Sequence, residues 1–98
     1  MSSVNERIAL TLEEALDTLE FALDAASVDY QTCDTPNVNQ YSLIFAEGTR
    51  IAYITAEELW DGEPAVFVDI YIVGADGTEH WVCGDMSVDA AVSYIAEA

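Results

Sequence analysis

The sequence predicts an α+β protein with an N-terminal helix, a four- or five-stranded, mostly antiparallel sheet and a short C-terminal helix. Apolar residues recur at helical spacing near both ends of the chain, whereas in the middle they alternate with polar residues, as in strands. The predicted connections are short, which favours strands paired in chain order as a meander. With 98 residues, the chain fits a single domain, residues 1–98, in which residues 1–9 are a loose polar lead-in.

The first helix is predicted over residues 12–26. Thr11-Leu12-Glu13-Glu14 has the spacing of a capping box, in which a threonine and a glutamate satisfy the first backbone amides of a helix. Apolar side chains then return every three or four residues and form one stripe: Leu12, Ala15, Leu16, Leu19, Ala22, Leu23 and Ala26. We therefore expect Thr11 to cap the helix and the stripe to face the core.

Strands are predicted at five places after this helix, separated by turn residues such as Glu47-Gly48 and Ala75-Asp-Gly-Thr. They are residues 28–33, 41–46, 50–55, 65–73 and 79–83, and a polar connection is predicted over residues 56–63. The strongest strand places Val66, Val68, Ile70 and Ile72 on one face, which we expect in the core. Ser87 precedes a last apolar stripe and predicts an N-cap for the C-terminal helix.

Charge is the most unusual feature of the composition. Nineteen aspartates and glutamates are opposed by two cations, Arg7 and Arg50, so the formal net charge is −17. The hydrophobic share of 52% argues against disorder. A surplus of negative charge this large opposes folding by self-repulsion, and it repels nucleic acids and anionic membranes. We therefore expect a cationic partner: a basic protein groove, a multivalent cation or concentrated salt.

Two acidic segments and their aromatic neighbours are the candidate partner-binding site. On a helical wheel, four carboxylates flank the apolar stripe within one narrow sector; we call Glu13, Asp17, Glu20 and Asp24 the acidic row. A second group surrounds Trp60: Glu57, Glu58, Asp61 and Glu63, the hairpin acids. Like charges at this helical spacing are unfavourable, and a row of them can imitate nucleic-acid phosphates. An ordinary solvated face is the alternative interpretation, and the sequence leaves open whether the two groups converge.

Aromatic residues are predicted on two surfaces. Phe21 lies opposite the apolar stripe among carboxylates, which is typical of a binding anchor; the alternative is that the N-terminal arm or a second subunit covers it. A second face of the sheet is predicted to carry Phe67, Asp69 and Tyr71 together with Tyr41, Tyr53 and Trp81. Three interpretations of this face remain open: a dimer interface, a partner site, or a second core under the C-terminal helix.

The sequence predicts neither an enzyme nor a cofactor or metal site. His80 is the sole histidine, and no credible nucleophile adjoins it. No P-loop, dinucleotide-binding glycine pattern or EF-hand ligand order occurs. Cys33 and Cys83 match no paired metal spacing and are expected to be buried thiols. Because a secretory signal and a long apolar segment are both absent from the sequence, we expect a cytoplasmic location.

In its small size, strong acidity and lack of lysine, the chain resembles a class of phage inhibitors that mimic DNA. This class includes anti-CRISPR proteins, restriction inhibitors and uracil-DNA glycosylase inhibitors. The local similarity to the last group covers about a third of the chain and consists of Ile51-Ala-Tyr-Ile-Thr, Ala65-Val-Phe-Val and Ala75-Asp-Gly. The acidic-hydrophobic helix segment with which those inhibitors plug the glycosylase cleft is not clearly present. The resemblance therefore implies a DNA mimic that occupies the basic nucleic-acid-binding groove of a host defence protein, a CRISPR effector or restriction enzyme, in the host cytoplasm.

Two other functions compete with mimicry. A protein adapted to a saline cytoplasm also has abundant Asp and Glu and little Lys, and its charge then serves solubility. A protein-binding adaptor or immunity module would instead use the aromatic sheet face, and a homodimer is a further use of the same face.

Overall fold

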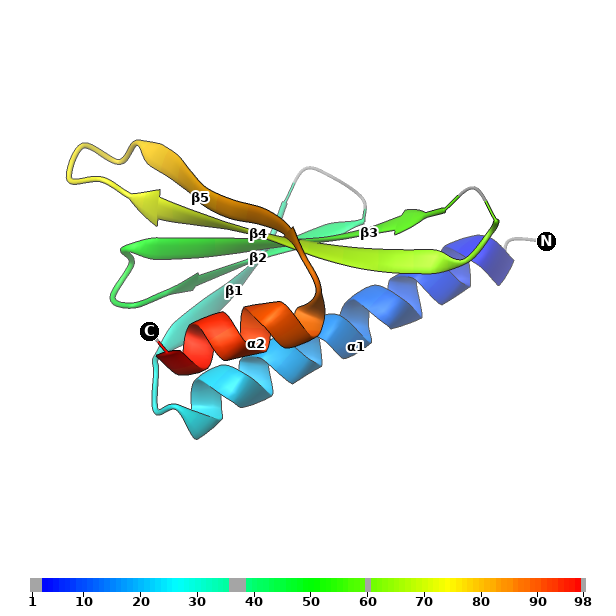
Figure 1. Ribbon diagram of the computed structural model, residues 1–98, viewed down its shortest axis with the longest axis horizontal. Helices are drawn as coiled ribbons and strands as arrows, with labels where there is room; N and C mark the ends of the chain where they lie inside the picture. The colour runs from blue at the N-terminus through cyan, green and yellow to red at the C-terminus, as the bar shows by residue number, and fades with distance from the viewer. Residues whose placement is uncertain (1–2, 36–38, 60, 98) are drawn as a thin grey trace.

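The fold is a five-stranded antiparallel sheet with two helices packed against one of its faces (Figure 1). The computed structural model describes residues 3–35, 39–59 and 61–97, and the side chains of residues 10–35, 39–59 and 61–96. The elements are α1 (Ser3–Ala25), β1 (Tyr30–Asp34), β2 (Gln40–Phe45), β3 (Arg50–Glu58), β4 (Pro64–Val73), β5 (Glu79–Met86) and α2 (Val88–Glu97). The strands lie in the order β1-β2-β3-β4-β5. The predicted α+β meander is confirmed.

The first helix begins earlier than its sequence suggested. It starts at Ser3, so Thr11 lies inside the helix, and the predictions of a loose lead-in and of a cap at Thr11 were wrong. Residues 3–11 contain neither Pro nor Gly, and Ile8 continues the helical spacing of Leu12 and Ala15. The helix ends where Ser27 takes a left-handed conformation with φ of 58°. The Val28 amide then donates to the Leu23 carbonyl at 2.9 Å, which closes the last turn.

The core lies between the sheet and both helices. Its fully buried side chains come from α1, the three central strands and α2, and include Leu19, Leu23, Leu43, Phe45, Ile54, Val68, Ile70 and Ile95. The predictions for Val68 and Ile70 and for five residues of the α1 stripe are therefore confirmed, the five being Leu12, Ala15, Leu16, Leu19 and Leu23. The stripe is narrower than predicted, because Ala22 is half-buried and Ala26 is exposed. Ile72 is an exception with 42% of its surface exposed, because it pairs with Arg50 and His80 near the end of β4, where its neighbours are not apolar.

The second helix packs beside α1 on the same side of the sheet (Figure 1). Ser87 caps it as predicted, since the Ala90 amide donates to the Ser87 hydroxyl oxygen at 3.1 Å. This position excludes a second core between α2 and the other sheet face. Among the described residues, no element covers that other face, which we call the open face.

Candidate protein-binding surfaces

The acidic row lies along the outer surface of α1, on the side next to β1. Glu13, Asp17 and Asp24 are exposed, and Glu20 is half-buried. The Thr32 hydroxyl donates to Glu20 at 2.5 Å, and the Tyr30 hydroxyl donates to Asp24 at 3.5 Å. Partial burial and the charges of Asp24 and Glu20 raise the pKa of Tyr30. The N-terminal half of the row thus faces solvent, while β1 holds its C-terminal half.

The hairpin acids lie around the turn between β3 and β4. The structure extends β3 to Glu58, so Glu57 and Glu58 are strand residues and not part of a loop, because β3 stays paired with β4 as far as Pro64. The turn is closed by a hydrogen bond from the Glu63 amide to Asp61 Oδ1 at 3.1 Å. All four hairpin acids are exposed. Trp60, predicted as their aromatic anchor, lies outside the described residues.

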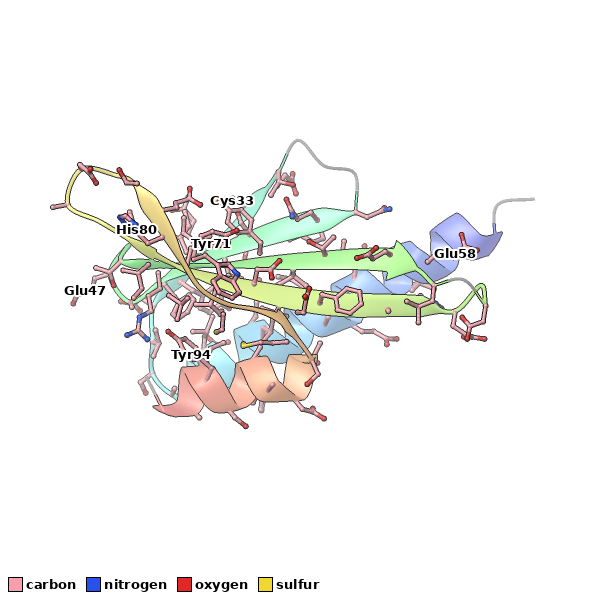
Figure 2. All side chains as sticks on the ribbon, turned by 45° about the horizontal axis from the view of Figure 1, so that its top comes forward. Cys33, Glu47, Glu58, Tyr71, His80 and Tyr94 are labelled. Carbon is pink, nitrogen blue, oxygen red and sulfur yellow. The ribbon has the colours of Figure 1, made fainter. Side chains whose placement is uncertain are left out.

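The two acidic groups approach each other without forming one compact cluster. Figures 1 and 2 place the β3–β4 turn at the end of the molecule where α1 begins, whereas Asp24 lies near the other end of α1. Other carboxylates lie elsewhere: Glu47 lies at the end of the long axis opposite to the hairpin acid Glu58 in Figure 2, and Asp69 lies on the open face. Negative charge therefore covers both faces and both ends of the protein.

Phe21 is the most exposed large hydrophobic residue described, with 75% of its surface accessible. Residues 3–9 continue α1 and run away from Phe21, so they do not cover it as one interpretation of the sequence required. Beside the ring is a groove of about 470 Å³ between the helices, which we call the helix groove. Small side chains leave this space open, and its lining comprises Thr18, Phe21, Ala22, Ala25, Ala26, Val92 and Ala96.

The open face carries most of the aromatic residues that the sequence placed there. Tyr53 and Tyr71 meet edge to face, with ring centres 5.5 Å apart and planes at 87°. Tyr71 pairs with Trp81 on β5, and the Trp81 side chain is 64% exposed. Tyr41 was wrongly assigned to this face. It pairs with Ile54 and packs against the core, because Tyr41 alternates in phase with Leu43 and Phe45.

Two carboxylates lie beside these tyrosines. The Tyr53 hydroxyl donates to Glu79 Oε1 at 2.7 Å, and partial burial together with this bond raises the pKa of Tyr53 to about 12. Asp69 Oδ1 accepts the Asp85 amide at 3.1 Å across a bulge between β4 and β5. Gly84 is needed here, because a Cβ at this position would collide with Asp69 Oδ1 and lie 2.8 Å from Trp81 Nε1. The sequence placed Asp69 on this face, which was one candidate partner site, whereas Glu79 and Gly84 had no predicted role in a site.

The remaining candidate residues have unremarkable surroundings. His80 is exposed on β5. Cys33 and Cys83 are free thiols and are half-buried, so the expectation of full burial was too strong; their strand partners place them on opposite sheet faces. Among the described residues, no group of three or more His, Cys, Asp or Glu side chains is arranged to hold a metal ion. No described helix is long and apolar enough to cross a membrane.

Comparisons with protein-family models, with curated proteins and with solved structures each found no match.

Proposed function

We propose that this protein is a DNA mimic that inhibits a basic nucleic-acid-binding protein. The acidic row and Phe21 on the outer surface of α1 enter the groove that otherwise holds nucleic acid. The observation that carries the proposal is the exposure of Phe21, 75%, with Asp17 and Asp24 one helical turn to either side. An exposed aromatic ring surrounded by charged side chains is the usual composition of a binding hot spot.

The two kinds of side chain have different roles in this proposal. Carboxylates of the acidic row and of the hairpin attract a Lys- and Arg-lined groove over a distance and accelerate the encounter. Exposed rim charges change mainly the association rate and its salt dependence. Phe21 supplies the desolvated contact that slows dissociation, and the helix groove beside it gives an apolar side chain of the partner a place to pack.

The sequence of residues 13–24, which holds the acidic row, contains no Lys or Arg, and this supports a role in recognition. Like charges at this helical spacing cost stability, and an interleaved Lys or Arg would relieve that cost. Of the two cations in the chain, Arg50 lies with its guanidinium carbon 5.4 Å from the ring centre of Tyr94 on α2. The row thus keeps a negative potential for a positively charged partner.

We propose a CRISPR effector or a restriction enzyme as the target, in the cytoplasm of a host cell. The test is capture of the partner from host lysate on immobilised protein, followed by elution with duplex DNA. We expect a basic nucleic-acid-binding protein that duplex DNA displaces. A captured partner that binds this protein and DNA at the same time would exclude mimicry.

A second candidate is adaptation to a saline cytoplasm, in which the charge keeps the protein soluble. The observation that favours it is the spread of carboxylates over both faces and both ends of the molecule, including Glu47, Asp69 and Glu79 far from the acidic row. Stability in low salt separates this candidate from mimicry, because a protein adapted to salt needs screening to remain folded.

A further inference from the structure

A hollow of about 320 Å³ lies on the open face of the sheet. Its lining combines two aromatic rings with two carboxylates and one amide, and we call it the tyrosine–carboxylate pocket: Gln40, Tyr53, Asp69, Tyr71 and Glu79. The volume is at the small end of the range for ligand pockets, roughly 300–1,000 Å³. The pocket therefore has room for one side chain.

The chemistry of the pocket selects a cation. Two carboxylates line it, and each of them accepts one hydrogen bond through one oxygen: Asp69 from the Asp85 amide and Glu79 from the Tyr53 hydroxyl. A carboxylate has a second oxygen to offer to a ligand's N–H groups. The faces of tyrosine rings are also negative, so a cation held over them is stabilised.

Several features hold the pocket in one shape before any ligand arrives. The hydrogen bond from Tyr53 to Glu79 joins β3 to β5 across the intervening strand β4. Edge-to-face packing fixes the Tyr53 and Tyr71 rings at 87° to each other. The bulge at Gly84 lets Asp69 approach the β5 backbone, which a larger residue would prevent. A preorganised site loses less entropy on binding.

We infer that the tyrosine–carboxylate pocket binds an arginine side chain of a basic protein partner. A guanidinium group is planar, so it can stack on a tyrosine ring while its N–H groups bind a carboxylate, whereas a lysine ammonium is a strongly hydrated point charge. The inference rests on the proposed function in one respect, namely that the partner is a basic protein. The arginine site adds a contact on the open face of the sheet, opposite to the helix layer that carries the acidic row.

The direct test is an NMR titration of the full-length protein with N-acetyl-arginine amide, and with N-acetyl-lysine amide as the comparison. We expect arginine to shift the backbone amide signals of Tyr53, Asp69, Tyr71 and Glu79 and to shift them further than lysine does at equal concentration. Shifts that centre on the acidic row, or equal shifts with both probes, would overturn the inference.

Variants test which groups of the pocket bind the probe. Tyr71→Leu removes a ring face and should weaken arginine binding by about two- to fivefold, whereas Tyr71→Phe keeps the ring and should bind as the wild type does. Glu79→Gln should also weaken binding. Its matched control is Glu13→Gln, which removes the same charge from the helix layer. Equal loss in Glu79→Gln and Glu13→Gln would mean that only overall charge matters.

Two experimental outcomes distinguish a failure of the arginine site from a failure of the proposed function. If a basic nucleic-acid-binding protein is captured and displaced by DNA, but the titration shifts avoid the pocket, the arginine site is excluded and mimicry stands. If arginine binds in the pocket but DNA does not compete with the captured partner, mimicry is excluded and the arginine site stands.

Discussion

Thr32 on the edge strand β1 donates a hydrogen bond of 2.5 Å to Glu20 on α1. The bond joins the acidic row to the sheet, although the two residues come from different elements. Tyr30 makes a longer contact of the same kind with Asp24 one helical turn further along. These contacts fix the side of α1 that faces β1, and thereby the direction in which Asp17 and Phe21 face solvent.

Replacing Thr32 by valine removes the hydroxyl and keeps a β-branched side chain suited to a strand. We expect Thr32→Val to lower the free energy of unfolding by about 0.5–1.5 kcal/mol, because a hydrogen bond to Glu20 is lost. Urea unfolding measures this change. Thr32→Ser keeps the hydroxyl and is the control; equal stability of Thr32→Val and the wild type would show that the bond contributes nothing.

Phe21 is expected to matter for binding and not for folding. Because its ring is 75% exposed, Phe21→Ala should change the free energy of unfolding by no more than about 0.5 kcal/mol, as for other surface residues. Leu19→Ala, at a fully buried position two residues away, should cost about 2–5 kcal/mol. If Phe21→Ala lowered the free energy of unfolding as much as Leu19→Ala does, the Phe21 ring would have to be covered in solution.

Salt should stabilise the protein without being required for folding. Thermal melts in about 0.01 M and about 1 M NaCl compare screening lengths of ~30 Å and ~3 Å. We expect a cooperative transition at both concentrations, with a higher Tm in the stronger salt because the repulsion within a net charge of −17 is screened. A protein that is unfolded in the weaker salt would favour salt adaptation over mimicry.

Tyr53 should titrate well above an ordinary tyrosine. Its pKa in the folded protein is about 12, against an unperturbed value of about 10. The folded state therefore binds the phenol proton more tightly than the unfolded chain does. This stabilisation is complete below about pH 10 and is lost as the pH rises through about 12.

The measurement compares the wild type with Tyr53→Phe, which lacks the titrating group, by urea unfolding across this pH window. The difference in unfolding free energy between the two proteins should shift against the wild type as the pH rises. A difference that stays constant from about pH 9 to about pH 12 would show that Tyr53 has an ordinary pKa.

The elements of the fold could be predicted because their signals are local. Apolar spacing located α1 and α2, alternation located the strands, and short turns fixed their order. Element limits were less predictable. Thr11 and Glu14 have the spacing of a capping box, but the same residues also fit a helix interior. The absence of a breaker before Thr11 and the helical spacing of Ile8 were the signals of an earlier start, which the structure places at Ser3.

The candidate sites depended on contacts that the sequence does not specify. The face that Tyr41 occupies follows from the phase of β2, and a shift of one residue moves every side chain to the other face. Tyr53 and Glu79 are far apart in the chain and meet only because β4 lies between their strands and the β4–β5 turn pairs Val73 with Glu79. Helical periodicity predicted that Phe21 is exposed. The sequence could not show whether residues 3–9 fold back over its ring, and the structure shows that they continue α1 instead.

Binding of purified CRISPR effectors and restriction enzymes as a function of salt tests the proposed mimicry most directly. The variant to compare with the wild type neutralises the acidic row: Glu13→Gln, Asp17→Asn, Glu20→Gln and Asp24→Asn. The control neutralises four carboxylates outside the row and the pocket: Asp34→Asn, Glu47→Gln, Asp76→Asn and Asp85→Asn.

We expect the affinity of the wild type to fall steeply between about 0.05 and about 0.5 M NaCl. At the lower salt concentration, neutralising the row should weaken binding by on the order of tenfold or more, and the control should lose much less. An affinity for the target that stays the same across this salt range, or an equal loss in both variants, would contradict the proposal that α1 takes the place of nucleic acid.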